Sequence, residues 1–198
     1  MKKYFILLLF ISTRLLSQAT EKEYYFVFLN SNPDRAELPE DSVNQLQQGH
    51  MANINRLAKE GKLITAGPVK GGGGIFILYA SSFDEVNEFL KTDPAIKTNR
   101  FKLEVYPMIT INGNLCKVSE EDFEMVSYTL IRYKNNITID EENKILVQIE
   151  LQERNEGIVV LNYDLEMGND KELSGFFNAE ETIYTKTLWI GRGSFCEN

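Results

Sequence analysis

The order of the apolar patterns between residues 24 and 106 is the feature that most limits how this chain can fold. Four short runs have the length and the aromatic and β-branched content of strands, at residues 24–29, 63–66, 75–79 and 101–106. Apolar side chains at helical spacing occupy residues 41–60, and a capping box that begins at Ser82 opens a second helix. The sequence therefore predicts the order β-α-β-β-α-β.

This order is that of the ferredoxin-like fold, in which two helices cover one face of a four-stranded antiparallel sheet. The other face of such a sheet needs a cover, either from a second copy of the chain or from a second domain. We therefore predict an α+β protein with a ferredoxin-like domain at residues 23–110. This domain is expected to pair either in a homodimer or with the rest of the same chain.

The rest of the chain, residues 123–198, is expected to form a smaller β-rich domain. Strand patterns occur at residues 126–133, 145–151, 158–163 and 185–190, and residues 170–178 have the spacing of one short helix. The segment Gly157–Leu161 resembles Gly74–Tyr79, so a decayed repeat is one interpretation. Against it, residues 140–154 alternate like a strand where a faithful copy would need a helix.

Residues 1–19 have the features of a cleaved export signal. Lys2 and Lys3 precede an apolar run at residues 4–11, and small residues at 17–19 fit a signal peptidase site. The run is too short for a stable membrane span, and Arg14 interrupts its extension. We therefore predict a periplasmic or secreted protein without a stable membrane span.

The charge of the chain argues against a nucleic-acid partner. Its formal charge is −8, and removal of residues 1–19 leaves 18 basic against 29 acidic residues, a charge of −11. Such a surface repels phosphate backbones. The acidic clusters do not have the spacing of a calcium loop, and we predict no metal site.

The two cysteines, Cys116 and Cys196, both lie in the part expected to be exported. In an oxidising compartment they could form a disulfide that closes a loop of about 80 residues and adds roughly 4 kcal/mol of stability in the chain-entropy model. The alternative is two buried free thiols.

His50, the only histidine, is the best candidate for a functional side chain. It lies four residues from both Leu46 and Ile54, in the apolar stripe of the first predicted helix, so it is expected to point inward. Asp93 precedes Pro94 just beyond the second helix. If the fold brings the imidazole and this carboxylate together, they form a minimal general acid and base. The alternative is a core histidine that Asp93 merely satisfies.

Three sequence features resemble the YCII-like family of dimeric α+β barrels over residues 24–108. They are the helix with His50, the strand end Leu63-x-x-Ala66-Gly67-Pro68 and the Asp93-Pro94 step. The resemblance implies that His50 and Asp93 face a pocket between helix and sheet, and relatives include a dehydrochlorinase that acts on a ring-cleavage product. The chain departs from the family at Ala95-Ile96, where an aromatic residue usually follows Asp-Pro, and an export signal is unusual for the family.

Two functions fit these observations. The first is a lyase or isomerase in which His50 is the general base or acid and Asp93 fixes its tautomer, acting on a small organic molecule. It needs no cofactor, and Gly71–Gly74 lacks the Lys-Ser or Lys-Thr that follows a phosphate-binding loop. The second is a non-catalytic module for small-ligand binding or assembly.

Overall fold

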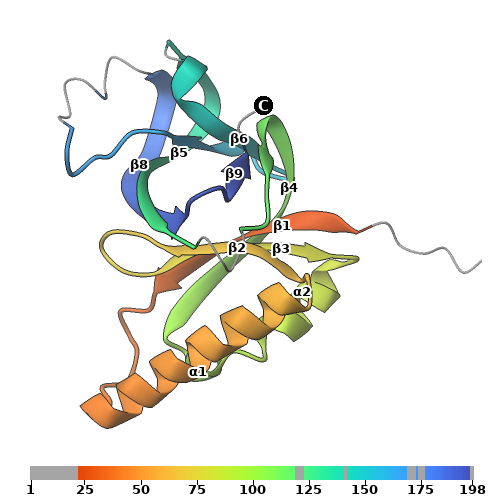
Figure 1. The fold of residues 1–198 in the computed structure, drawn as a ribbon, viewed down its shortest axis with the longest axis vertical. Coiled ribbons are helices and arrows are strands. Elements are labelled where there is room, and N and C mark those ends of the chain that lie inside the picture. The colour runs from red at the N-terminus through yellow and green to blue at the C-terminus, as the bar shows by residue number, and fades with distance from the viewer. Residues whose placement is uncertain (1–21, 119–122, 141, 169–172, 174–176, 197–198) are drawn as a thin grey trace, which may run out of the picture.

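The computed structural model describes residues 22–118, 123–140, 142–168, 173 and 177–196 (Figure 1). The export signal predicted at residues 1–19 lies outside these residues, and so does most of the short helix predicted at 170–178. Phe177 and Asn178 belong to a strand and not to that helix. Within the described part, no helix is both long enough and apolar enough to cross a membrane.

The first half of the chain has the predicted element order. Its elements are β1 (Glu23–Ser31), α1 (Glu40–Lys59), β2 (Leu63–Pro68), β3 (Gly74–Ala80), α2 (Phe83–Leu90), α3 (Pro94–Lys97) and β4 (Phe101–Leu115). The four strands are antiparallel in the order β2-β3-β1-β4, which is the ferredoxin-like order. The helices lie on one side of this sheet, below it in Figure 1.

Two details of the first half differ from the expectation. The predicted order has no helix after the second one, but the Asp-Pro step begins the short helix α3, with Asp93 as its N-cap. Strand β4 does not end at residue 106 but continues to Leu115, because its second part pairs with a strand of the second half.

The second half repeats the strand order of the first. It contains β5 (Met125–Ile139), a 3-10 turn η1 (Glu142–Lys144), β6 (Ile145–Leu151), β7 (Glu156–Leu161), β8 (Phe177–Gly191) and β9 (Phe195–Cys196). Four of these strands are ordered β6-β7-β5-β8, which again places the second strand first, then the third, the first and the fourth. The turn η1 stands where a copy of α1 would be. A decayed repeat therefore stays one interpretation, in which the second half would have the strands of the first without its first helix.

The two halves pair within one chain. Strand β4 forms an antiparallel ladder with β6, from Met108↔Leu151 to Gly113↔Val147. On the other side, a single bridge, Val69↔Leu188, joins the end of β2 to β8. The sheet therefore closes on itself, and the fourth strand of each half faces the second strand of the other.

Alternation along the strands produces two apolar layers. Phe26 and Phe28 of β1 face the interior shared by the halves, where they pack with Leu130 and Ile158 of the second half. Val27, between them, faces the helices. Successive strand residues point to opposite faces, and β1 can serve both layers because it is apolar at every position from Tyr24 to Leu29.

A disulfide fastens the two halves at the end of β4. Cys116 and Cys196 are bonded, with their Cα atoms 5.7 Å apart. Beside the bond, β9 pairs with the end of β4, and the backbone N–H of Cys116 donates to the carbonyl of Ser194 at 2.9 Å. The last described residues, which end at Cys196, are thereby held against the segment that follows β4.

Candidate active site

Helix α1 carries His50 toward the sheet. Acidic Glu40 and Asp41 in its first turn and basic Arg56 and Lys59 in its last turn complement the helix dipole. The His50 ring stacks on Phe76 of β3, with 5.9 Å between ring centroids and 19° between planes. Since the side chain of His50 is 12% exposed, it keeps a restricted opening to solvent.

Asp93 is fixed by the start of α3. Its Oδ1 accepts hydrogen bonds from the backbone N–H groups of Ala95 at 2.9 Å and Ile96 at 3.3 Å. Asp is a favoured N-cap residue, and Pro94 suits the first helical position because it has no N–H to leave unpaired. The carboxylate is completely buried, so its orientation is set by these contacts.

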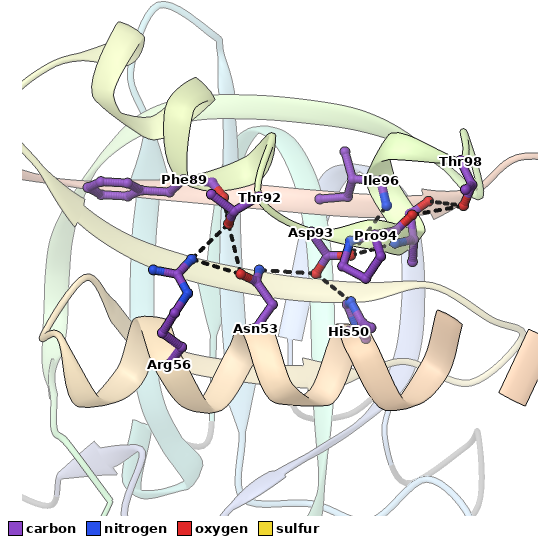
Figure 2. Close-up of polar contacts among 10 residues, drawn as sticks. His50, Asn53, Arg56, Phe89, Thr92, Asp93, Pro94, Ile96 and Thr98 are labelled. Carbon is purple, nitrogen blue, oxygen red and sulfur yellow. Dashed lines mark hydrogen bonds and ion pairs between the residues drawn. The ribbon is translucent and has the colours of Figure 1, made fainter. Parts of the chain in front are cut away.

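The structure brings the two predicted site residues together. His50 Nδ1 lies 2.7 Å from Asp93 Oδ2. Figure 2 shows the two side chains meeting between α1 and the start of α3. Burial alone would raise the pKa of Asp93, but the hydrogen bond and charge of His50, with the N–H groups of Ile96 and Ala95, lower it overall. An ionised carboxylate only accepts, so Nδ1 of His50 is the donor. The other ring nitrogen, Nε2, is left to take up or release a proton.

Asn53 is a third member of this group and was not predicted from the sequence. Its Nδ2 donates to Asp93 Oδ2 at 3.3 Å, while its Oδ1 accepts from Nη2 of Arg56 at 2.8 Å (Figure 2). A guanidinium only donates and a carboxylate only accepts, so the amide has one consistent orientation. The available signal was the spacing of His50, Asn53 and Arg56, three residues apart on one helix face.

His50 opens onto a cavity of about 560 Å³. The cavity lies between α1 and β2 and β3, with Met51, Ile54 and Phe101 among its apolar walls. Its size is within the range of pockets that hold small organic molecules.

The second half of the chain supplies part of the cavity wall. The contributing residues are Phe123, Met125, Gly191 and Ser194 of the second half, together with Lys117 and Val118 of the segment that follows β4. They were not predicted from the sequence, because their position depends on how β8 and the end of β4 meet β2. Across this seam the hydroxyls of Thr65 and Ser194 are 2.8 Å apart and buried.

Among the described residues, no group of three or more His, Cys, Asp or Glu side chains is placed to hold a metal ion. The hydrogen-bonding capacity of Asp93 is taken up by His50, Asn53 and the start of α3.

Fold and site together define a ferredoxin-like α+β domain with a buried His–Asp pair at a cavity between its first helix and its sheet. Residues 24–109 match the family model of the YCII-related domain, and this part of the chain is a YCII-related domain. The family resemblance inferred from the sequence is thereby confirmed.

One solved structure is similar to most of the chain. It is described as a "putative monooxygenase from Lactobacillus acidophilus NCFM", is 14% identical in sequence, and aligns over 89% of this chain and 100% of its own with a TM-score of 0.43. No curated protein matches the sequence.

Proposed function

We propose that the protein is a cofactor-free lyase or isomerase that moves a proton on a small organic molecule, with His50 as the general base and acid. One observation carries the proposal: an imidazole bonded through Nδ1 to a buried carboxylate lines a cavity large enough for such a molecule. Asp93 fixes the tautomer and stabilises the imidazolium that forms. General acid–base catalysis of this kind contributes about 10²- to 10⁴-fold to a rate.

The proposed step begins at a carbon next to a carbonyl group. His50 Nε2 takes a proton from that carbon, and the electron pair of the broken C–H bond moves toward the carbonyl to give an enolate. Where a carbon–carbon double bond adjoins that carbon, the charge of the enolate extends along it, and return of the proton to the far carbon completes an isomerisation. Expulsion of a leaving group with its bonding electrons, followed by proton release from His50, completes an elimination.

The alternative function is a non-catalytic ligand-binding module. A buried carboxylate needs hydrogen-bond partners whether or not it takes part in catalysis, and His50 and Asn53 supply them. The mainly apolar cavity would serve binding alone equally well. The two functions differ in whether proton transfer at the ligand depends on His50.

Hydrogen–deuterium exchange tests this difference directly. The full chain would be incubated in D2O with a panel of small ketones, esters and lactones, and loss of the α-proton signal followed by NMR. We expect the wild type to accelerate exchange for some members, His50→Gln to lose this acceleration at least 100-fold, and the exposed control Gln48→Ala to keep it. Exchange that is equal in wild type and His50→Gln, or ligand binding without exchange, would favour the binding module.

We further propose that the protein works outside the cytoplasm, in the periplasm or after secretion. The disulfide between Cys116 and Cys196 supports this, because such bonds persist in oxidising compartments and are rare where thiols are kept reduced. Alkylation of free thiols in freshly lysed cells, followed by mass measurement, tests the proposal. Modification of both cysteines in the native location would contradict it.

A further inference from the structure

The wall that the second half contributes to the cavity lies outside the YCII-related domain. The family match ends at residue 109, whereas Val118, Phe123 and Met125 follow it in the chain. The second half has no histidine of its own, and between β5 and β6 its described residues form the turn η1 and not a helix like the one that carries His50. Its contribution to the site is therefore this wall.

Phe123 and Met125 line the cavity, and large parts of their side chains are exposed to solvent although apolar side chains are usually covered. Phe123 is 59% exposed and Met125 is 45% exposed, and Met51 of α1, which also lines the cavity, is 46% exposed. Exposed apolar side chains that gather at one concave site are typical of ligand contact.

Phe123 is nevertheless held in place. A Cβ atom built on Gly191 would come within 2.9 Å of Phe123 Cε2 and 3.2 Å of Val118 Cγ2, so both side chains pack closely over this glycine. The next residue, Glu124, accepts from Arg192 Nε at 2.6 Å, and its carbonyl accepts from the Arg192 N–H at 2.7 Å. The aromatic ring is thus presented at the cavity by a segment fastened to the end of β8.

The composition of the cavity indicates the chemistry of its ligand. Three phenylalanines, Phe76, Phe101 and Phe123, and two methionines, Met51 and Met125, line it. Phenylalanine faces and edges and methionine sulfur atoms all make favourable contacts with aromatic rings.

We infer that the second half forms the ligand-selecting wall of the His50 cavity, in which Phe123 and Met125 contact the aromatic body of a small-molecule ligand. This inference builds on the proposed function, because it places the reacting end of the same ligand at His50. It assigns substrate selection to residues that the YCII-related domain does not contain.

Methyl-labelled methionine gives an internal test. The full chain, labelled with 13C at the methionine methyl groups, would be titrated with 2-naphthol, whose ring shifts the NMR signals of groups that it contacts. We expect saturable shifts at Met51 and Met125. Met108, buried in the core, and Met167, 87% exposed and not lining the cavity, serve as controls and should not move. Equal shifts at Met167, a shift at Met51 without Met125, or no saturable shift would overturn the inference.

Paired phenylalanine variants complete the experiment. Phe123→Ala is expected to weaken 2-naphthol binding about tenfold, as loss of part of a buried aromatic contact implies. Phe83→Ala removes a phenylalanine of similar exposure, 49%, that lies at the start of α2 and not at the cavity, and should leave the affinity unchanged. An equal effect of the two variants would overturn the inference. His50→Gln separates the two proposals, because it should abolish exchange while 2-naphthol still binds.

Discussion

Gly49 of α1 lies so close to Pro94 of α3 that a Cβ atom at position 49 would stand 2.7 Å from the Cγ atom of the proline ring. These two residues are the chain neighbours of His50 and Asp93. The absence of a side chain at Gly49 therefore lets the helix approach the N-cap of α3 closely enough for the 2.7 Å His50–Asp93 hydrogen bond.

Gly49→Ala should therefore disturb the His–Asp pair. Helix propensity alone favours alanine by about 1 kcal/mol, whereas a clash with a rigid ring costs about 1–3 kcal/mol. We expect α1 and α3 to separate and the proton on His50 to be no longer confined to Nδ1. The 15N spectrum of this single histidine reports which nitrogen carries the proton. Gln48→Ala, an exposed change on the same helix, should leave the spectrum as in wild type, and an unchanged spectrum in Gly49→Ala would contradict the argument.

The lowered pKa of Asp93 predicts how the stability of the protein depends on pH. Because its pKa is lowered below the ordinary value of 3.8 in the folded protein, the ionised form stabilises the fold above that pH. This stabilisation is lost as the pH falls through the lower, folded-state pKa. Asp93→Asn should be less stable than wild type at neutral pH, and the difference in unfolding free energy should shrink below about pH 4. Urea titrations from pH 7 to pH 3 measure it, and a difference independent of pH would refute the assignment.

An ion cluster between the two halves, centred on a buried arginine, predicts that one substitution will cause a large loss of stability. Arg132, with its side chain 6% exposed, lies between Glu104 and Glu156, at 2.9 Å and 2.6 Å from their carboxylates. Arg132→Met leaves Glu104 without its cation and leaves Glu156 with only the exposed Arg154, at 3.2 Å, and should lower the unfolding free energy by about 3–5 kcal/mol. Lys91→Met, which breaks an exposed pair with Glu88, should have little effect.

The change of stability with pH distinguishes the effect of charge in this cluster from the effect of packing. Burial opposes ionisation of Glu104, but hydrogen bonds from Arg132 and Tyr106 outweigh it and lower its pKa to about 2. Wild type should lose the stability due to Glu104 as the pH falls from about 4.5 toward 2. Arg132→Met should instead regain part of its lost stability over the same range as Glu104, which no longer has its cation, becomes protonated. A parallel pH profile for the two proteins would mean that packing, not charge, accounts for the loss.

The paired strands predict a monomer. In an isolated ferredoxin-like sheet β2 and β4 would be edges open to a partner, whereas here β4 pairs with β6 and the end of β2 is bridged to β8. We expect sedimentation equilibrium to give the mass of one chain across a hundredfold range of concentration. A dimer that persists on dilution would show that another surface of the chain associates.

The disulfide should contribute measurably to stability. It joins residues separated by 80 positions, and the chain-entropy model gives about 4 kcal/mol for a loop of this length. Cys116→Ser combined with Cys196→Ser is expected to lower the unfolding free energy by a comparable amount in denaturant titrations. Reduction of the wild type should reproduce the effect, whereas reductant should not change the double variant.

The elements of the first half were predictable because their signals are local. The apolar spacing predicted a helix at residues 41–60, and α1 is found at Glu40–Lys59. The helix start predicted at Ser82 is found, with the serine side chain accepting from the backbone N–H of Glu85, while the Glu85 carboxylate accepts from the backbone N–H of Ser81. Helical periodicity and caps depend on residues within a few positions of one another, so a single sequence contains them.

The lengths of the strands were not predictable in the same way. Strand β4 was expected to end at Tyr106, yet it continues to Leu115 because its second part finds partners in β6, more than thirty residues away. Strand β5 likewise extends to Ile139 along β8. A ladder is fixed by both of its strands, and alternation along one of them does not contain the register.

The candidate site likewise has features that the sequence predicts and features that it does not. The sequence by itself determined that His50 faces inward and that Asp93 follows the second helix, since helical periodicity and the Asp-Pro step are local features. Only the tertiary structure decided that they meet at 2.7 Å, that Asn53 fixes the carboxylate, and that Phe123 and Met125 wall the cavity. These relationships depend on the close contact of Gly49 with Pro94 and on the pairing of two halves of the chain, neither of which is set by residues near one another in sequence.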